Sequence, residues 1–349
     1  MYDDVAYDTL EGPAALVAPG AVVTMRVLLT HPVDARPLTR LAERTHLTTW
    51  PGPYPIPTDH LAREVARCDG LVCLLADYVS SHVLDKSPRL RVVANVAVGY
   101  DNIDVGHAAR LGVAVTNTPD VLTEATAELT WAVLLALVRG VVPARQALLD
   151  GEWRYWSPTG FLGRGLDGKT LGVVGLGRIG RAVAARAAAF GMSVVALGSR
   201  GHGPYPRLER EAFLAAADVV TLHVPLMPDT RRMVDESFLA RMKPGAFLVN
   251  TARGGLVDED ALLGALNTGR LAGAALDVFD REPVDGRHPL AAHPRVLATP
   301  HIGSATVETR AAMAERAVDN VVRALAGVRP RDLVNPTAWP GRCGWPQPE

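Results

Sequence analysis

Three charged residues that are able to do acid–base chemistry follow predicted strands in the second half of the chain. Because the carboxyl ends of parallel strands meet at one edge of an open α/β sheet, where ligands bind, we expect these side chains to converge on one crevice. The residues are Arg253 after the predicted strand 246–250, Glu282 after 274–278 and His301 after 295–298.

A histidine paired with a carboxylate keeps a fixed ring orientation and can donate a proton near neutral pH. A guanidinium beside it offers two donors to a planar carboxylate, which suits an acidic substrate. Together with a nicotinamide, the set suits reduction of a 2-oxo acid, with hydride going to the carbonyl carbon and a proton to its oxygen. Taken singly, each residue is better explained by a structural role: Arg253 as a strand cap, Glu282 as a solvated loop acid and His301 as a loop histidine. Their places at successive strand ends favour the chemical interpretation.

The stretch that would position a nicotinamide cofactor is Leu171-Gly-Val-Val-Gly-Leu-Gly-Arg-Ile-Gly180. Its apolar start and the helically spaced residues after it predict a strand, a turn and a helix. Gly175, Gly177 and Gly180 match the dinucleotide fingerprint: the first allows the turn, the second lets backbone approach a pyrophosphate, and the third lets helix pack on strand. The phosphates bind the free N–H groups where such a helix begins. In a chain with 32 glycines the pattern alone is weak, so its context must decide.

Six strands are predicted from the fingerprint onward, which is the number that a full doubly wound dinucleotide domain needs. Between Met25 and Asn117, strand and helix signals alternate as in a parallel sheet with helices on both faces. A long helix is predicted over 306–326 and is expected to return to this first domain. The six strands are 170–174, 194–197, 219–222, 246–250, 274–278 and 295–298.

Two α/β domains are therefore expected, one inserted into the other. The first comprises residues 25–120 and 304–335, and the nucleotide-binding domain comprises 121–303. Residues 1–24 are interpreted as a flexible extension and 336–349 as a tail, because neither shows a sustained period. Trp153, Tyr155 and Trp156 follow the helices of the first crossing; we favour a packed loop there over a subunit contact or a lid.

The chain resembles the D-isomer-specific 2-hydroxyacid dehydrogenases from Met25 to Asn335, and most of all the glyoxylate/hydroxypyruvate reductases. The resemblance rests on the fingerprint and on motifs in a fixed order. These are Val96-Ala-Val-Gly-Tyr-Asp-Asn-Ile-Asp104, Asn117-Thr-Pro-Asp-Val-Leu-Thr123, Asn250-Thr-Ala-Arg-Gly-Gly-Leu-Val-Asp258, Ala275-Leu-Asp-Val-Phe279 with Glu282, and Thr299-Pro-His-Ile-Gly303. It implies a flavodoxin-like substrate domain with a Rossmann NAD(P)-binding domain inserted into it, and a homodimer.

The resemblance also implies roles for individual residues. His301 is the expected general acid/base, Glu282 its orienting partner and Arg253 the clamp on the substrate. The amides of Val98 and Gly99 are expected to receive the substrate carboxylate, with Leu75 and Ala76 beside the side-chain pocket, and Asp277 and the Thr251 carbonyl to hold the nicotinamide amide. Further cofactor contacts are expected from Arg178, Ile179, Gly198, Ser199, Arg200, His223, Val224, Pro225, Thr230, Ala252, His301 and Gly303. Asp258, in contrast, is interpreted as a helix N-cap, and His288 and His293 as surface residues.

One position departs from the common pattern. NAD-binding domains carry an acidic residue about 20 positions after the fingerprint, where it accepts hydrogen bonds from the ribose. In this family it follows the third glycine after 17 intervening residues, and Gly198 stands there. Because Gly198-Ser199-Arg200 has no carboxylate to repel a 2′-phosphate and offers a hydroxyl and a guanidinium to bind one, we predict that NADP(H) is favoured, with NAD(H) as the alternative.

The composition of the chain limits the kinds of molecule that it is expected to bind. The chain has 349 residues, with 36 Lys and Arg against 37 Asp and Glu and no long run of one sign, so neither a nucleic-acid face nor a membrane patch is indicated. The three cysteines lack metal-ligand spacing and are read as core thiols, without a metal site. The acidic N-terminus argues against a signal peptide, so a cytoplasmic enzyme is expected.

Two alternatives stay open at this point. One is a nucleotide-sensing, corepressor-like binding protein of the same fold, although no docking motif or long regulatory tail is visible. The other, within the enzyme class, is a phosphite dehydrogenase.

Overall fold

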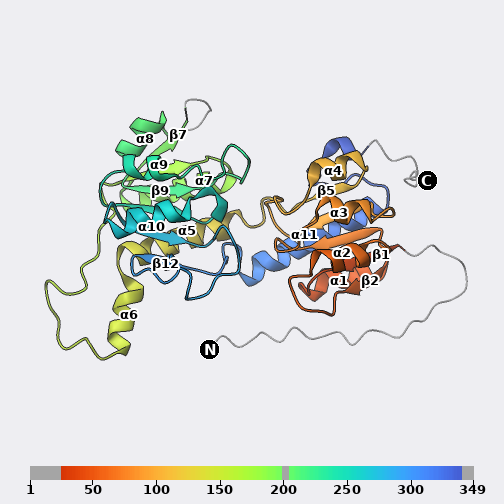
Figure 1. Cartoon of the computed structure of the whole chain (residues 1–349), viewed down its shortest axis with the longest axis horizontal. Helices are drawn as coiled ribbons and strands as arrows, with labels where there is room; N and C mark the ends of the chain where they lie inside the picture. Colours follow the sequence, from red (N-terminus) through yellow and green to blue (C-terminus); the bar gives the residue numbers. More distant parts are fainter. Residues whose placement is uncertain (1–24, 199–203, 340–349) are drawn as a thin grey trace, which may run out of the picture. The chain divides into compact units, whose positions relative to one another are not determined.

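The computed structural model describes residues 25–198 and 204–339. It divides into two compact units (Figure 1). Unit 1 contains the chain up to Leu122 together with the chain from Thr306 onward, and unit 2 contains Thr123–Ala305. Unit 2 is thus an insertion between two parts of unit 1.

Unit 1 is built on a five-stranded, fully parallel sheet in the order β2-β1-β3-β4-β5, which is the flavodoxin-like order. The strands are β1 (Arg26–Leu29), β2 (His46–Thr49), β3 (Gly70–Cys73), β4 (Val92–Asn95) and β5 (Ala114–Thr116). The helices are α1 (Ala35–Ala42), α2 (Thr58–Val65), α3 (Ser81–Asp85), α4 (Val105–Arg110) and α11 (Val307–Leu325), with a short 3₁₀ turn, η3 (Pro336–Ala338). Buried aliphatic strands explain this layering, since a parallel sheet must be covered on both faces.

The last long helix belongs to unit 1. Thr306 begins it as N-cap, accepting a hydrogen bond from the Thr309 amide, and its buried face contacts β3, β4 and β5. Asn335, farther along, accepts a hydrogen bond from the Val115 amide in β5 and donates one to the carbonyl of Val113, just before that strand. The end of the described chain is therefore tied into the unit 1 core, and η3 lies where no structure was predicted.

Unit 2 contains a seven-stranded parallel sheet in the order β12-β11-β10-β9-β6-β7-β8, as in a Rossmann domain. The strands are β6 (Thr170–Val174), β7 (Ser193–Leu197), β8 (Arg207–Leu208), β9 (Val219–Leu222), β10 (Ala246–Asn250), β11 (Leu271–Leu276) and β12 (Val296–Ala298). The helices are α5 (Thr123–Val138), α6 (Val141–Leu149), α7 (Arg178–Ala187), α8 (Arg210–Ala216), α9 (Glu236–Arg241) and α10 (Glu259–Asn267), with 3₁₀ turns η1 (Ala188–Phe190) and η2 (Gly254–Leu256). Two strands were not predicted: β8, which has only two residues, and β2 in unit 1, which is largely exposed.

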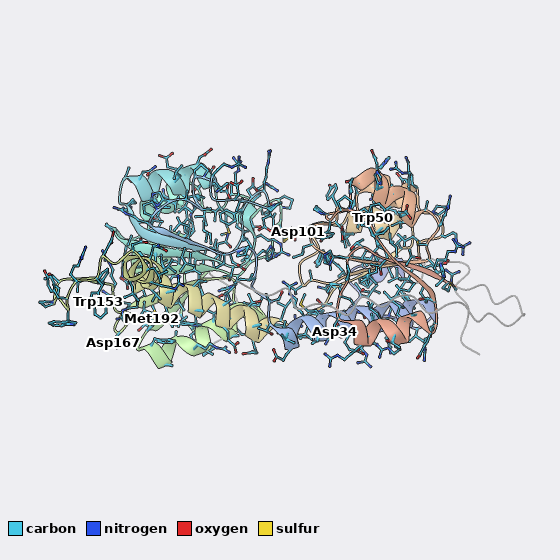
Figure 2. The ribbon with its side chains drawn as sticks, turned by 90° about the horizontal axis from the view of Figure 1, so that it is seen from below. Asp34, Trp50, Asp101, Trp153, Asp167 and Met192 are labelled. Carbon is cyan, nitrogen blue, oxygen red and sulfur yellow. The ribbon has the colours of Figure 1, made fainter. Side chains whose placement is uncertain are left out.

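The segment formed by α6 and residues 150–165, which we call the arm, extends away from the sheet of its own unit (Figure 1). No residue of α6 is buried. The packed-loop interpretation of the aromatic segment is wrong: Tyr155 and Trp156 are 76% and 78% exposed, and Trp153 lies at the outer margin of its unit (Figure 2).

Among the described residues, no single helix has the length and apolar composition to cross a bilayer. The helices α5 and α6 have this length and composition only when they are taken together, and they are bent by 60° relative to each other.

Candidate active site

Arg253, Glu282 and His301 lie just beyond the carboxyl ends of β10, β11 and β12, which are neighbours in the unit 2 sheet. His301 Nδ1 and Glu282 Oε2 are 2.7 Å apart. The charge of Arg253 also acts on the Glu282 carboxylate. The structure therefore brings the three residues together at one edge of the sheet, as their places after successive strands predicted.

Glu282 is held as a carboxylate. Burial opposes its ionisation, but the hydrogen bond and charge of His301, the Phe279 amide and Arg253 outweigh burial and lower the pKa of Glu282. Its second oxygen accepts the Phe279 N–H at 3.0 Å, so both oxygens are fixed. An ionised, fixed acceptor sets the imidazole tautomer: Nδ1 carries the hydrogen toward Glu282, and Nε2 is the nitrogen left to exchange a proton with a ligand.

His301 occupies an unusual backbone conformation, with φ of 56°. Non-glycine residues avoid this left-handed region unless the surroundings impose it. At His301 the conformation is imposed by contacts with Asp277. The backbone carbonyl oxygen of Asp277 accepts the His301 N–H at 2.9 Å. The Asp277 carboxylate accepts three more hydrogen bonds from the same loop: from the Thr299 hydroxyl at 2.6 Å and from the Ile302 and Gly303 amides at 2.8 Å each.

Asp277 thus anchors the loop that presents the histidine, a role that its strand position did not reveal. Burial raises the pKa of Asp277, although these hydrogen bonds oppose the increase. A carboxylate has about four acceptor positions, so one remains for the nicotinamide amide implied by the family resemblance.

Arg253 is fixed by backbone contacts around it. The Asn250 side chain donates to the Arg253 carbonyl at 2.8 Å and accepts the Ala252 amide at 3.1 Å, and the guanidinium donates to the Ala252 carbonyl. Next to it, a Cβ on Gly254 would lie 1.8 Å from the Phe279 carbonyl carbon. The turn that carries Arg253 is therefore pressed against the backbone that leads to Glu282, with no room for any side chain.

The fingerprint glycines have the geometry that a dinucleotide requires. Gly175 has a φ of 95°, and a Cβ on Gly180 would lie 1.9 Å from the Gly175 carbonyl oxygen. Gly177 is the N-cap of α7, and a Cβ there would meet nothing within 4 Å. The first glycine is needed for the turn, the third for helix–strand contact, and the second leaves the helix N-terminus open to an anion. Arg178 and Ile179 begin α7 itself.

The other predicted cofactor residues lie along the same sheet edge. His223, Val224, Pro225 and Thr230 follow β9, and Thr251 and Ala252 follow β10. Burial lowers the pKa of His223 to about 3, so its ring is neutral, and it pairs with the Thr221 hydroxyl at 2.9 Å. Gly198 directly follows β7 and has a φ of 116°. Ser199 and Arg200 lie outside the described residues.

The predicted substrate residues of unit 1 also lie at strand ends: Leu75 and Ala76 after β3, and Val98 and Gly99 after β4. Three asparagines that the sequence analysis missed surround these loops. Asn95 and Asn117 donate to the Gly99 and Val98 carbonyls, and Asn102 donates to the Leu74 carbonyl. Asn95 is the last residue of an otherwise apolar strand, and this polar residue was the sign in the sequence that could have identified it.

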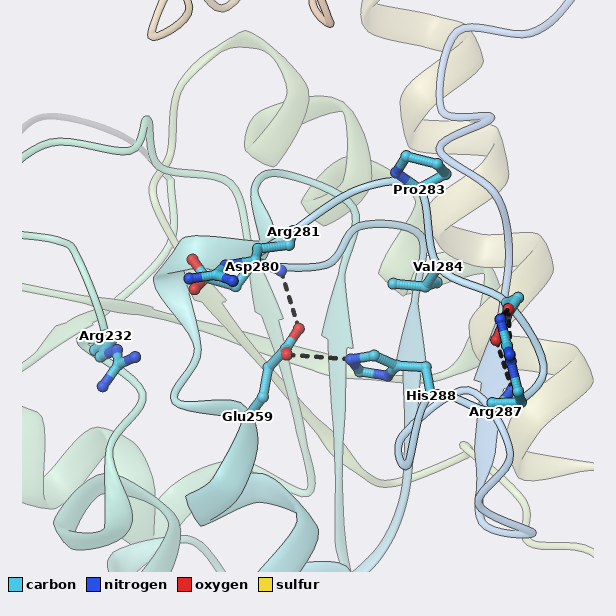
Figure 3. A pocket seen from close by; sticks show the side chains of 9 residues that line it. Arg232, Glu259, Asp280, Arg281, Pro283, Val284, Arg287 and His288 are labelled. Carbon is cyan, nitrogen blue, oxygen red and sulfur yellow. Dashed lines mark hydrogen bonds and ion pairs between the residues drawn. The ribbon is translucent and has the colours of Figure 1, made fainter.

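A pocket lined by residues on both sides of Glu282 in the chain, among them Arg281 and Pro283, has Glu259 at its centre (Figure 3). Glu259, in the first turn of α10, accepts the Asp280 amide at 2.9 Å and lies 3.4 Å from His288 Nε2. His288 was interpreted as a surface residue, but its side chain is only 24% exposed and packs against the Phe279 ring. Glu259 and His288 therefore support both ends of the loop that carries Glu282. Asp258 is the N-cap of α10, as predicted, and accepts from the Ala261 amide.

Comparison with known proteins agrees with this geometry. Residues 131–303 match the family model described as D-isomer specific 2-hydroxyacid dehydrogenase, NAD binding domain. A glyoxylate reductase of Korarchaeum cryptofilum is 43% identical over 317 residues, covering 89% of this chain and 96% of the relative.

Two solved structures extend the comparison to the whole fold. A protein of Thermus thermophilus superposes with a TM-score of 0.85 at 47% identity, covering 89% of this chain and all of its own (100%). An NADPH-dependent glyoxylate/hydroxypyruvate reductase of Sinorhizobium meliloti, in complex with NADP and malonate, gives a TM-score of 0.78 at 34% identity, covering 90% and 98% of the two chains.

Proposed function

The chain belongs to the D-isomer-specific 2-hydroxyacid dehydrogenases, and we propose that it reduces small 2-oxo acids, glyoxylate or hydroxypyruvate first, to D-2-hydroxy acids with NAD(P)H. The observation that carries the proposal is the His301–Glu282 pair, 2.7 Å apart beside Arg253 at the edge of a Rossmann sheet. The names of the relatives support the substrate class, since glyoxylate reductases match almost the full length of the chain.

Each residue has a defined task in this reaction. When bound, the nicotinamide supplies the hydride for the carbonyl carbon. His301 gives a proton from Nε2 to the carbonyl oxygen, and the ionised Glu282 stabilises the imidazolium before that transfer and holds the ring afterwards. Arg253 binds the substrate carboxylate and carbonyl oxygen, which draws electron density away from the carbon that is reduced.

We assign the substrate carboxylate to the amides of Val98 and Gly99 in unit 1, with Leu75 and Ala76 beside the substrate side chain. The fingerprint glycines and the residues after β9 and β10 receive the cofactor. This assignment follows the family resemblance and is consistent with the placement of all these residues at the carboxyl ends of strands.

A panel of short 2-oxo acids against both nicotinamide cofactors tests the function. Nicotinamide absorbance should fall with glyoxylate or hydroxypyruvate, and chiral analysis should find the D-hydroxy acid where the product is chiral. Absence of turnover with every short 2-oxo acid, together with specific capture of a protein partner, would favour the corepressor-like alternative. Turnover with phosphite alone would favour a phosphite dehydrogenase.

NADPH is expected to give the higher kcat/KM, because Gly198 offers no carboxylate to the 2′-phosphate. Arg200→Ala should lower kcat/KM for NADPH about 10- to 100-fold, the value of a lost charge-assisted hydrogen bond, and should change the value for NADH little. Arg210→Ala serves as a control, because Arg210 is an exposed arginine on α8 that pairs with Asp235. A higher kcat/KM with NADH in the wild type contradicts this cofactor assignment.

We also propose a homodimer that covers the arm. Its exposed apolar residues include Leu148 (53%), Leu149 (60%) and Trp156 (78%), and clusters of this kind mark interaction surfaces. The double variant Leu148→Asp/Leu149→Asp should elute from gel filtration as a monomer, whereas the wild type and Val307→Asp should elute as dimers. Val307 is an equally exposed apolar residue (79%) outside the arm. A wild type that elutes as a clean monomer rules the dimer out.

A further inference from the structure

The loop that follows β4 has three consecutive carbonyl groups held from the body of unit 1. The Thr118 amide donates to the Ala97 carbonyl at 2.8 Å. The side chain of Asn117 donates to the Val98 carbonyl at 2.7 Å, and that of Asn95 donates to the Gly99 carbonyl at 2.8 Å.

These contacts determine the direction of three N–H groups. In a planar trans peptide the N–H points opposite to the carbonyl of the preceding residue. Asn117 therefore fixes the Gly99 N–H through the Val98 carbonyl, and Asn95 fixes the Tyr100 N–H through the Gly99 carbonyl. The Thr118 amide fixes the Val98 N–H in the same way, through the Ala97 carbonyl. Within the described parts of the chain, none of these three N–H groups donates a hydrogen bond to another protein group.

One of the two donor side chains, that of Asn95, is itself held in place. Asn95 is fully buried, and its amide also donates to Asn102 Oδ1 at 3.1 Å. Asn102 in turn donates to the Leu74 and Asp77 carbonyls at 3.1 and 3.0 Å. The loops after β3 and β4 are thus joined by one buried amide network, so the N–H groups are oriented before a ligand arrives.

We propose that Asn117 and Asn95 are positioning residues for the substrate carboxylate: by holding the Val98 and Gly99 carbonyls inward, they present consecutive backbone N–H groups to the anion. The inference rests on the proposed function, whose carboxylate site it explains, and extends it to Tyr100. Oriented donors bind an anion without reorganisation, so their loss weakens binding although no direct contact is removed.

Steady-state kinetics with glyoxylate test the proposal. Asn117→Ala and the volume-retaining Asn117→Leu should raise the KM for glyoxylate about 10-fold, the effect of one lost hydrogen bond, with kcat and the KM for the cofactor unchanged. A raised KM with an unchanged kcat means that the substrate and the transition state lose the same amount of binding free energy. Asn335→Ala is the control, because that side chain makes two hydrogen bonds of 2.8 Å to other unit 1 backbone and none to the loop after β4.

Calorimetric titration of the cofactor-loaded protein with oxalate tests the positioning role of Asn117 separately from the proposed reductase function, because binding of oxalate does not require turnover. Oxalate that binds the wild type and binds both Asn117 variants about 10-fold more weakly, with Asn335→Ala like wild type, supports the positioning role even if no 2-oxo acid is reduced. The role is overturned if the wild type does not bind oxalate, if the folded Asn117 variants bind it as the wild type does, or if Asn335→Ala loses as much.

Discussion

Replacement of His301 by asparagine is expected to lower kcat by a factor of about 10² to 10⁴, the usual contribution of a positioned proton donor. Asparagine is preferred to alanine because His301 has a φ of 56°, and asparagine tolerates left-handed backbone better than most residues other than glycine. The loop held by Asp277 should therefore keep its shape, and the loss of rate should come from the missing proton donor.

The measurement is the initial rate of NADPH oxidation at saturating 2-oxo acid. His293→Asn is the control, because His293 is a half-buried histidine of the same unit that accepts the Arg295 amide and does not contact Glu282. A near-wild-type rate for His301→Asn would remove the histidine from the reaction and with it the mechanism proposed above.

The second large effect is expected at Arg253. Arg253→Ala should lower kcat/KM for glyoxylate by a factor of about 10² to 10³, as the loss of a preorganised donor to a developing oxyanion does. Arg253→Lys should recover only part of the loss, because an ammonium group keeps the charge but not the planar pair of donors.

Arg281→Ala provides the comparison for Arg253, since Arg281 is an exposed arginine next to Glu282 on the same loop. It should stay within about threefold of wild type, because exposed charges contribute little. If Arg253→Ala and Arg281→Ala were equal in kcat/KM, the guanidinium would act only through the general charge of the surface and not as a clamp.

The order of strands and the meeting of Arg253, Glu282 and His301 could be predicted because both depend on signals local in sequence. Buried strands read as apolar runs, and parallel strands bring their ends to one edge. The strands β2 and β8 gave no such signal, since β2 is largely exposed and β8 has two residues. The exposed arm was misread for a related reason: aromatic residues usually indicate burial.

The supports of the site could not be predicted, because they are contacts between residues far apart in the chain. The Asp277 carboxylate bonds a loop that begins 22 residues later, and nothing in its own strand distinguishes that role from cofactor binding. The Asn117–Val98 contact and the Glu259–His288 pair are of the same kind. Neither hydrophobic periodicity nor a motif specifies which carbonyl a given asparagine will meet.

The close contact between Gly254 and the Phe279–Asp280 peptide limits how this enzyme can be changed. It joins the turn of Arg253 to the loop of Glu282, so neither residue can shift to admit a bulkier substrate without moving the other and the histidine paired with it. Directed evolution toward larger 2-oxo acids should therefore yield few useful substitutions between residues 250 and 282. The productive ones should accumulate in the loops after β3 and β4, which carry Leu75 and Ala76 of the proposed side-chain pocket.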